Sequence, residues 1–381
     1  MKRNSVLDFD KGLLLAFFGL LVIGVYVIYS GSNFRALELG RSASYYAMKH
    51  IMVMCGGLFF MSLAVVIDHR ILHKLARPAF FVCLIALLAV VAVGAVTKGA
   101  ARWINLFGVS LQPAELMKIA FFALMSRKLS ELGDDIRDFK KGFVYPMITL
   151  GVVCALILLQ PNLSMALMIF ATTYILFFSS GVRLKYLSSS VVPAILLIVG
   201  LCLMEPYRMK RITAFLHPEE HLKEGGYQLW SSLVSLGHGG WFGTGVGQGT
   251  QKLGFLPESY KDVAYSLLGE ELGLLGTAVV LFLFGVIVYR GLMIARGAPS
   301  RFSRYLAICL TSSLAFNVAF HVAVCTGLIP TTGQPLPFIS YGGTNLIVSM
   351  VSVGILLNIS RARTGFVDEP RSDVQDERSL A

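Results

Sequence analysis

LGLLGTAVVLFLFGVIVY, at residues 272–289, contains no charged side chain and consists almost wholly of apolar residues and glycine. A helix of that length covers about 27 Å, close to the ~30 Å thickness of a bilayer's hydrocarbon core. A membrane-spanning barrel would instead show short segments of alternating polarity. The stretch therefore predicts a transmembrane helix.

Similar uncharged runs recur along the chain. Apolar residues make up 55% of the 381 residues and charged residues only 14%, unlike the balance of a soluble domain. We predict spans at residues 12–29, 51–67, 78–97, 111–126, 142–159, 162–182, 186–204, 272–289, 305–329 and 342–359. The expected fold class is an all-α polytopic membrane protein with about ten transmembrane helices.

The polar parts of the chain are distributed unevenly. A long polar segment, residues 205–261, separates the seventh and eighth spans. Residues 364–381 are polar and charged, and we expect a disordered tail there. No stretch outside the spans is long enough to fold alone, so residues 1–363 are predicted to form a single membrane domain.

The distribution of Lys and Arg predicts the orientation. With ten spans and the N-terminus inside, the inside loops and termini hold about two thirds of the 33 Lys and Arg residues, as the positive-inside rule requires. The fourth span is weak because it carries Glu115 and Lys118, but without it the arginines of residues 290–304 would lie outside. We therefore expect both termini in the cytoplasm and the 205–261 segment outside. The net charge of +11 then reflects loops beside anionic lipid and gives no reason to expect nucleic acid.

Charged side chains at membrane depth need a compensating partner or a function. Glu115 and Lys118 are three residues apart, so on a helix they share one face and can form an ion pair. Such a pair can be purely structural, holding a short helix against its neighbours. It can equally form a polar cavity wall that binds a charged headgroup or a cation, and the pattern does not separate the two.

The segment QKLGFLPESYKDVAYSLLGEELG, residues 251–273, brings carboxylates to the edge of the membrane. Ser259 and Asp262 form an S-x-x-D pattern, which is typical of a helix N-terminus. Capping is therefore the more probable role of Asp262 on these residues alone, and a catalytic carboxylate facing a cleft is the alternative. Arg102 and Trp103 pose a similar choice between an interfacial anchor and an anion clamp.

The glycine series of residues 237–249, GHGGWFGTGVGQG, is not a dinucleotide-binding or phosphate-binding loop. No strand–turn–helix unit surrounds it, and it lacks the terminal Lys-Ser/Thr pair. With Trp230, Trp241 and Phe242 it is interpreted as an interfacial piece that packs against neighbouring spans or admits a lipid tail. His321 lies within a span and is predicted to hydrogen-bond to a neighbouring helix, not to bind a metal.

Several segments together resemble the SEDS family (shape, elongation, division, sporulation). The resemblance covers the chain from the first span to the last, and GEELG with LPFISYGG is more similar to the division type than to the elongation type. The segments that carry it are GAARWINLFGVSLQPAELMK (99–118), PYRMKRI (206–212), GYQ (226–228), QKLGFLPE…D…GEELG (251–273) and PLPFISYGGTN (335–345).

The resemblance implies a peptidoglycan glycosyltransferase that polymerises lipid II into glycan strands at the outer face of the cytoplasmic membrane, for septal wall synthesis in cell division. It also implies a class B penicillin-binding protein as the transpeptidase partner, other division proteins of the membrane, and a divalent cation, Mg or Mn, without an organic cofactor. A lipid II flippase, an elongation-type polymerase and a non-enzymatic scaffold of the division machinery are the alternatives.

The resemblance also implies roles for individual residues. Asp262 matches the family's catalytic carboxylate, Glu115 and Lys118 match an ion pair of its cavity, and no metal ligand is identified. The remaining candidates are the possible pyrophosphate contacts Arg102, Lys252 and Arg208 and the cavity residues Ser340 and Tyr341.

Three positions depart from the family pattern. Tyr260 and Lys261 stand where His and Thr are usual, Asn162 stands where Asp is common, and Thr344 replaces a frequent Ser. Lys261 puts a cation beside Asp262, which favours the charged carboxylate and reduces its basicity. Asn162 removes a carboxylate, so position 162 is not expected to bind a metal.

Overall fold

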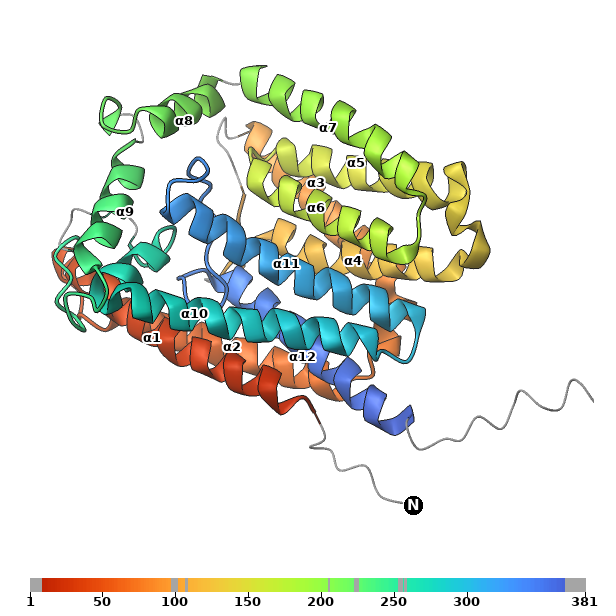
Figure 1. Ribbon diagram of the computed structural model, residues 1–381, viewed down its shortest axis with the longest axis horizontal. Coiled ribbons are helices and arrows are strands. Elements are labelled where there is room, and N and C mark those ends of the chain that lie inside the picture. The colour runs from red at the N-terminus through yellow and green to blue at the C-terminus, as the bar shows by residue number, and fades with distance from the viewer. Residues whose placement is uncertain are drawn as a thin grey trace, which may run out of the picture.

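The computed structural model describes residues 9–96, 102–106, 109–204, 206–222, 226–252, 256 and 259–366. The described chain is a bundle of long helices that run side by side, with a smaller group of helices across one end (Figure 1). The bundle consists of α1 (Lys11–Glu38), α2 (Tyr45–Val66), α3 (Arg70–Val96), α4 (Pro113–Glu131), α5 (Tyr145–Leu158), α6 (Leu163–Ser180), α7 (Leu184–Met204), α10 (Ala264–Arg296), α11 (Arg301–Cys325) and α12 (Gly343–Phe366).

The expectation of about ten spans is confirmed. Eight helices of the described residues are long and apolar enough to cross a membrane by length and composition. The other two bundle helices are α4, whose charged residues lower its hydropathy, and α7, whose apolar part Leu184–Leu196 is shorter. Most of α4 is buried between α3, α11 and α12, so it can carry polar residues without exposing them to lipid.

The eighth span is longer than predicted and is broken. It begins at Ala264 instead of residue 272, and the helix is interrupted at Gly273, where φ is 67° and ψ is −166°. Only glycine adopts this backbone conformation readily. Hydropathy located the apolar half of α10. It missed the first half, which contains Glu270 and Glu271 and does not read as a continuous apolar run.

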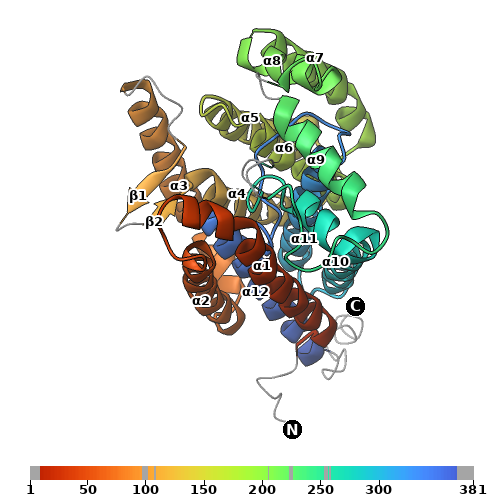
Figure 2. The ribbon, with the colours of Figure 1, turned by 90° about the vertical axis from the view of Figure 1, so that its left-hand side faces the viewer.

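The segment between α7 and α10 lies across one end of the bundle. It contains α8 (Pro206–Leu216), α9 (Gly226–Gly239) and the turns of residues 240–252, which we call the glycine loop. Figure 2 shows this end, which we call the α8–α9 end, facing the viewer.

Two short elements complete the described chain. A two-stranded hairpin, β1 (Ile104–Leu106) and β2 (Val109–Leu111), connects α3 to α4, and two short turns, η1 (Gly133–Arg137) and η2 (Phe139–Val144), precede α5. Helix α12 continues to Phe366, slightly past the predicted start of the tail at 364. The remainder of that predicted tail lies outside the described residues.

Candidate active site

Asp262 lies directly before α10 and lines a cavity of about 130 Å³ at the α8–α9 end, which we call the Asp262 cavity. Among the described residues that line it, Asp262 is the one carboxylate, and two cations, Arg102 and Lys261, line the same cavity. The other polar lining residues are Gln112, Asn162, Thr332, Gln334, Tyr341 and Asn345.

The segment that carries Asp262 is held from one side by three tyrosine rings. The centroids of Tyr46 and Tyr260 are 5.3 Å apart, those of Tyr260 and Tyr341 are 5.7 Å apart, and Tyr260 is buried. The Tyr341 amide donates a hydrogen bond to the Tyr260 carbonyl at 2.8 Å. The residues before Asp262 are thereby tied to the chain that precedes α12.

The capping role predicted for Ser259 and Asp262 is wrong. The N-cap residue of α10 is Val263, which makes no side-chain capping hydrogen bond. Ser259 instead donates to the carbonyl of Gly31 in α1 at 3.0 Å. The S-x-x-D pattern misled because the chain between these residues forms turns and the helix starts only at Ala264.

Much of the cavity wall is formed by the loop between α11 and α12. His321 of α11 holds this loop, since its Nδ1 lies 2.8 Å from the Gln334 carbonyl and its Nε2 accepts a hydrogen bond from the Tyr265 amide at 3.4 Å. A β-carbon on Gly333 would lie 3.5 Å from Asp262 Oδ2. The prediction that His321 is hydrogen-bonded is confirmed, and its partners join the loop to the start of α10.

A second cavity, of about 310 Å³, adjoins the first and is lined by Arg102, Arg208 and Arg211. We call it the arginine cavity. Both cavities share Arg102, Asn162 and Thr332 in their walls. An anionic group in the arginine cavity therefore meets guanidinium groups, which suit phosphate oxygens, next to the carboxylate of Asp262.

The three arginines that line the arginine cavity come from two parts of the fold. Arg102 precedes β1 and donates to the carbonyls of Gln160, at 3.0 Å, and Pro161, at 2.7 Å. Arg208 and Arg211 are one turn apart on α8, and Arg211 donates to the Thr331 carbonyl at 2.8 Å. The structure thus brings Arg102 and Arg208 together, as predicted, although they are distant in sequence.

Tyr341 and Ser340 differ in their relation to the cavity. Tyr341 lines it, and burial raises the pKa of its hydroxyl above the ordinary value while the positive charges of Lys49 and Lys261 lower it. The hydroxyl therefore remains protonated at neutral pH and can donate a hydrogen bond. Ser340 is buried and lines neither cavity; its Oγ accepts from the Leu336 amide at 2.9 Å and closes the turn that presents Tyr341.

Glu115 and Lys118 form a buried ion pair of 2.7 Å between Glu115 Oε2 and Lys118 Nζ. Asn345, which lines the Asp262 cavity, donates to Glu115 Oε1 at 3.1 Å. The space beside Lys118 is only about 10 Å³, at the lower limit for one water molecule. This favours the structural alternative, in which the pair supports the cavity wall through Asn345.

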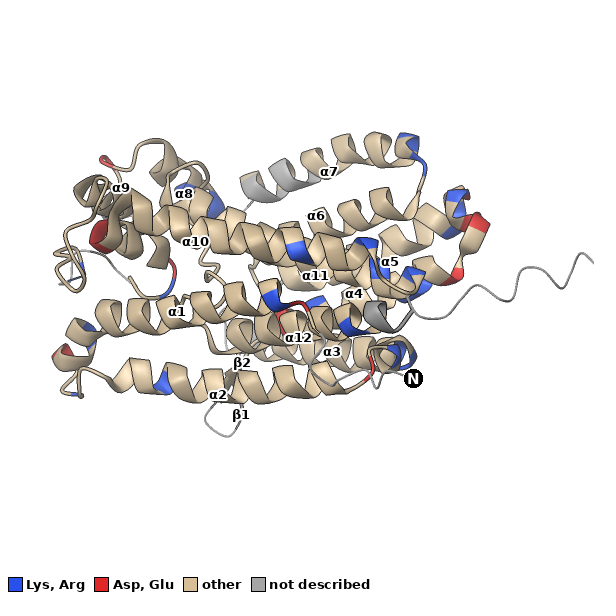
Figure 3. Ribbon diagram, turned by 60° about the horizontal axis from the view of Figure 1, so that its bottom comes forward, with Lys and Arg blue, Asp and Glu red and all other residues tan. Residues whose placement is uncertain are grey.

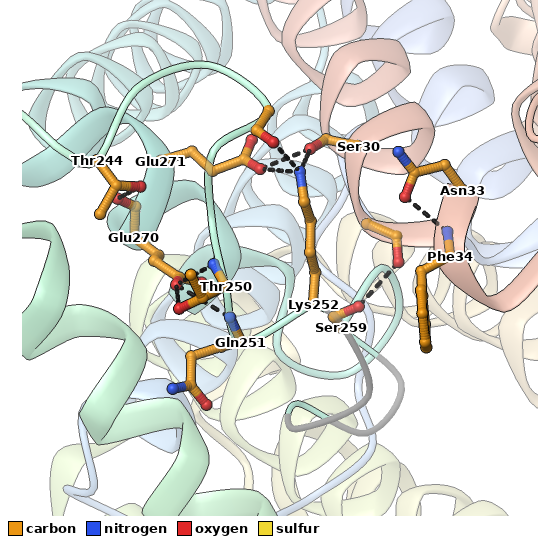
Figure 4. Close-up of polar contacts among 12 residues, drawn as sticks. Ser30, Asn33, Phe34, Thr244, Thr250, Gln251, Lys252, Ser259, Glu270 and Glu271 are labelled. Atoms are coloured by element: carbon orange, nitrogen blue, oxygen red, sulfur yellow. Dashed lines mark hydrogen bonds and ion pairs between the residues drawn. The ribbon is translucent and has the colours of Figure 1, made fainter.

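The structure places Lys252 away from both cavities, so it does not bring this residue to the predicted pyrophosphate site. Its Nζ bonds with Glu271 Oε1 at 2.7 Å, with Ser30 Oγ at 2.8 Å and with the Gly247 carbonyl at 2.7 Å (Figure 4). Tyr26 also donates to Glu271. Lys252 is thus part of a buried network that joins the glycine loop to α1.

The glycine loop packs against the break in α10, as the packing interpretation predicted. The amides of Thr244 and Gly245 donate to the carbonyls of Glu270, at 2.9 Å, and Glu271, at 3.1 Å. The amide of Leu274, just beyond the break, donates to the Gly240 carbonyl at 2.9 Å. The loop therefore replaces hydrogen bonds that the helix loses at the break.

The side chain of Glu270 adds to this attachment. Its Oε1 accepts from the amides of Thr250, at 2.8 Å, and Gln251, at 3.1 Å (Figure 4). Both carboxylates of the GEELG segment thus serve the loop and not the cavities.

The described residues around Asp262 do not fit a resident divalent cation. Within the described ranges, no three or more His, Cys, Asp or Glu residues cluster in a way that could hold a metal ion. Magnesium and manganese prefer oxygen ligands, carboxylates above all. No second carboxylate is found among the described lining residues, and the cations Lys261 and Arg102 line the same cavity as Asp262. Their charges oppose the binding of a metal ion there.

Among the residues of the two cavities that the sequence prediction missed are one charged side chain, Arg211, and three amides. Arg211 had a signal, since it follows Arg208 by three residues in PYRMKRI and so shares its helix face. The amides of Gln112, Gln334 and Asn345 had none, because single amides occur along any chain. Asn162, named only as a departure, lies in both cavity walls and accepts a hydrogen bond from Gln334 at 3.3 Å.

Solved structures share this fold. This chain is similar to a chain of the structure described as "Structural coordination of polymerization and crosslinking by a peptidoglycan synthase complex", with a TM-score of 0.78 and 25% identity, covering 94% of this chain and 99% of that one. The fold also matches the crystal structure of Thermus thermophilus rod shape determining protein RodA, with a TM-score of 0.70 and 24% identity over 94% and 98% of the two chains.

Sequence relatives cover nearly the whole chain. It is 38% identical to the probable peptidoglycan glycosyltransferase FtsW of Trichlorobacter lovleyi, over 94% of this chain and 95% of that protein. It is 35% identical to stage V sporulation protein E of Bacillus subtilis, over 90% and 94%. The family model described as "Cell cycle protein" matches residues 11–365. The chain therefore belongs to the FtsW/RodA/SpoVE family, the SEDS proteins that its motifs resemble.

Proposed function

We propose that this protein is a peptidoglycan glycosyltransferase of the FtsW type that polymerises lipid II. The observation that carries the proposal is the position of Asp262, the one carboxylate among the described residues of its cavity. This cavity shares wall residues with a second cavity, which is lined by Arg102, Arg208 and Arg211. The relatives named FtsW, to one of which the chain is 38% identical, support the same activity.

The proposed reaction joins two lipid-linked sugars. A hydroxyl of one lipid II attacks the anomeric carbon of the other glycan, the bond from that carbon to the lipid pyrophosphate breaks, and the hydroxyl proton passes to Asp262. The pyrophosphate leaves with its electron pair and gains negative charge. Guanidinium groups of the arginine cavity stabilise that charge.

The direction of the protein in the membrane follows from charge. Figure 3 shows more Lys and Arg at the end of the bundle where α1 begins than at the α8–α9 end, where α8 itself carries some. The positive-inside rule assigns that end to the cytoplasm. We infer that both termini are cytoplasmic and that Asp262 faces the outer side of the cytoplasmic membrane, where lipid II is used at the division septum.

A class B penicillin-binding protein is the proposed partner, with other division proteins of the membrane. The related complex is described as one of polymerisation and crosslinking, and a transpeptidase supplies the crosslinking step. The class of the partner rests on family resemblance.

The test is polymerisation of fluorescent lipid II by purified protein together with its transpeptidase partner. Asp262→Asn keeps the shape of the side chain but cannot accept the proton, so we expect the rate to fall by at least about 100-fold. Glu220→Gln, at an exposed carboxylate after α8, is the matched control and should polymerise normally. Retained polymerisation by folded Asp262→Asn protein would remove Asp262 as the base.

A further inference from the structure

The lining of the two cavities has a strong excess of positive charge. Among the described residues that line them, Asp262 carries the one negative charge, and the cations are Arg102, Lys261, Arg208 and Arg211. Cations fixed in a partly enclosed hollow attract anions more strongly than the same cations in water. This excess suits a ligand with several negative charges and disfavours a metal ion.

Lys261 has a defined place in this hollow. It is half-buried, lines the Asp262 cavity, and has its Nζ 5.4 Å from the centroid of the buried Tyr260 ring. A cation over an aromatic face is attracted to it, and Tyr260 is itself fixed by Tyr46 and Tyr341. The ammonium of Lys261 is thus anchored beside the carboxylate that we propose as the base.

The positive charge of Lys261 also affects a second residue of the cavity. It acts on the hydroxyl of Tyr341, whose pKa it lowers against the effect of burial. Lys261 and Arg102 therefore place positive charge in the cavity that Asp262 and Tyr341 also line. A phosphate oxygen that enters the Asp262 cavity meets both cations.

We propose that Lys261, together with Arg102, supplies the positive charge that a pyrophosphate leaving group requires beside Asp262, so that polymerisation by this chain depends only weakly on a divalent cation. The inference rests on the proposed function. It assigns to fixed side chains a role that the family resemblance gave to Mg or Mn, and it agrees with the poor fit of this cavity to a metal ion.

The first experiment measures lipid II polymerisation in EDTA and over a titration of MgCl2. The wild-type protein should keep at least about half of its maximal rate in EDTA. Lys261→Met should lose about tenfold in EDTA, equivalent to about 1.4 kcal/mol, and Mg²⁺ should restore its rate to within about twofold. Lys261→Arg keeps the charge and should behave like the wild type, as should Lys210→Met, which removes an exposed lysine of α8 outside both cavities.

The second experiment measures binding without turnover. The dissociation constant of undecaprenyl pyrophosphate in EDTA should rise about tenfold in Lys261→Met and stay unchanged in Lys210→Met, equivalent to about 1.4 kcal/mol. Equal magnesium dependence of wild type and Lys261→Met, or equal affinity for undecaprenyl pyrophosphate, would overturn the inference. If no variant polymerises lipid II in any condition, the proposed function fails, and the binding result still decides the inference about Lys261.

Discussion

At the scale of the residue, this protein uses its charges in two separate ways. The cavity charges are unbalanced, with Asp262 outnumbered by arginine and lysine side chains. The buried pairs Glu115–Lys118 and Lys252–Glu271 are balanced and closed by hydrogen bonds from Asn345 and Ser30. The excess of positive charge in the cavities suits an anionic ligand, whereas the two buried ion pairs connect elements inside the bundle.

Gly333→Ala should impair the reaction more than the fold. Gly333 has a φ of +66°, and a β-carbon there would lie 3.5 Å from Asp262 Oδ2. Gly40→Ala is the matched control, because Gly40 has the same φ of +66° and no neighbour within 4 Å of an added β-carbon. Both variants should lose about 1–2 kcal/mol of stability, whereas only Gly333→Ala should slow lipid II polymerisation. Equal rates would show that the approach to Asp262 has no influence on the chemistry.

Lys252→Met should lower the thermal unfolding temperature in detergent strongly. It leaves the buried carboxylate of Glu271 without its cation, and breaking a buried pair in this way costs about 3–5 kcal/mol. The double variant Lys252→Met with Glu271→Gln removes both charges, keeps a carbonyl for Tyr26 and Ser30, and should recover much of the loss. Arg35→Met, at an exposed pair with Glu38, should change the unfolding temperature little. A single variant as stable as the double one would contradict the structural role.

The sequence predicted part of this site. Asp262, Arg102, Arg208 and Tyr341 were named and do line the two cavities. Lys252 could not be placed, because its partner Glu271 reaches it only after the glycine loop folds back onto α10. A charge pattern along a chain shows that an ion needs compensation, but it does not show which distant residue provides it.

At the scale of the element, α10 combines two helices of different character. Hydropathy predicted the second half, because apolar residues facing lipid give a clear signal. It missed the first half, residues 264–272, because that piece is buried among protein and its backbone breaks at Gly273. The glycine loop completes the hydrogen bonds of the break, so these two segments form one folded unit despite their separation along the chain.

Gly273→Ala should prevent folding of this unit. The new β-carbon would lie 2.4 Å from the Gly243 amide nitrogen and 2.6 Å from the Trp241 carbonyl, and the backbone conformation there is accessible essentially to glycine alone. We expect a loss of more than about 3 kcal/mol, from backbone strain together with overpacking, and little monodisperse protein after size-exclusion chromatography. Gly285→Ala, in the same helix with open space at its β-carbon, should be as stable as the wild type. A well-behaved Gly273→Ala protein would mean that the break is not required.

At the scale of the whole molecule, the sequence predicted the architecture well and the hollow poorly. Ten long runs of apolar residues, one of them weakened by Glu115 and Lys118, were sufficient to predict the spans. The cavities depend on how loops from four regions meet at one end of the bundle. That meeting is set by hydrogen bonds such as the one from Arg211 to Thr331, which no periodic pattern reports.

The orientation can be tested by cysteine labelling in spheroplasts, with the six native cysteines replaced by alanine. Glu220→Cys, at the exposed turn after α8, should react with a membrane-impermeant maleimide in intact cells. Lys140→Cys, at the exposed turn before α5, should react only after permeabilisation. The reverse result would place Asp262 on the cytoplasmic side and contradict the proposed function.

Arg102 stands in the wall between the two hollows, and this has a genetic consequence. An allele at position 102 is expected to be pleiotropic, because one codon change alters both the affinity for the substrate and the rate at which it is converted. Arg208 and Arg211 border only the larger hollow, farther along the wall from the proposed base. Raising the intracellular supply of precursor should therefore suppress the growth defect of alleles at these positions more fully than that of an allele at position 102. Precursor overproduction would therefore separate alleles at positions 208 and 211, which it suppresses well, from alleles at position 102, which it suppresses poorly.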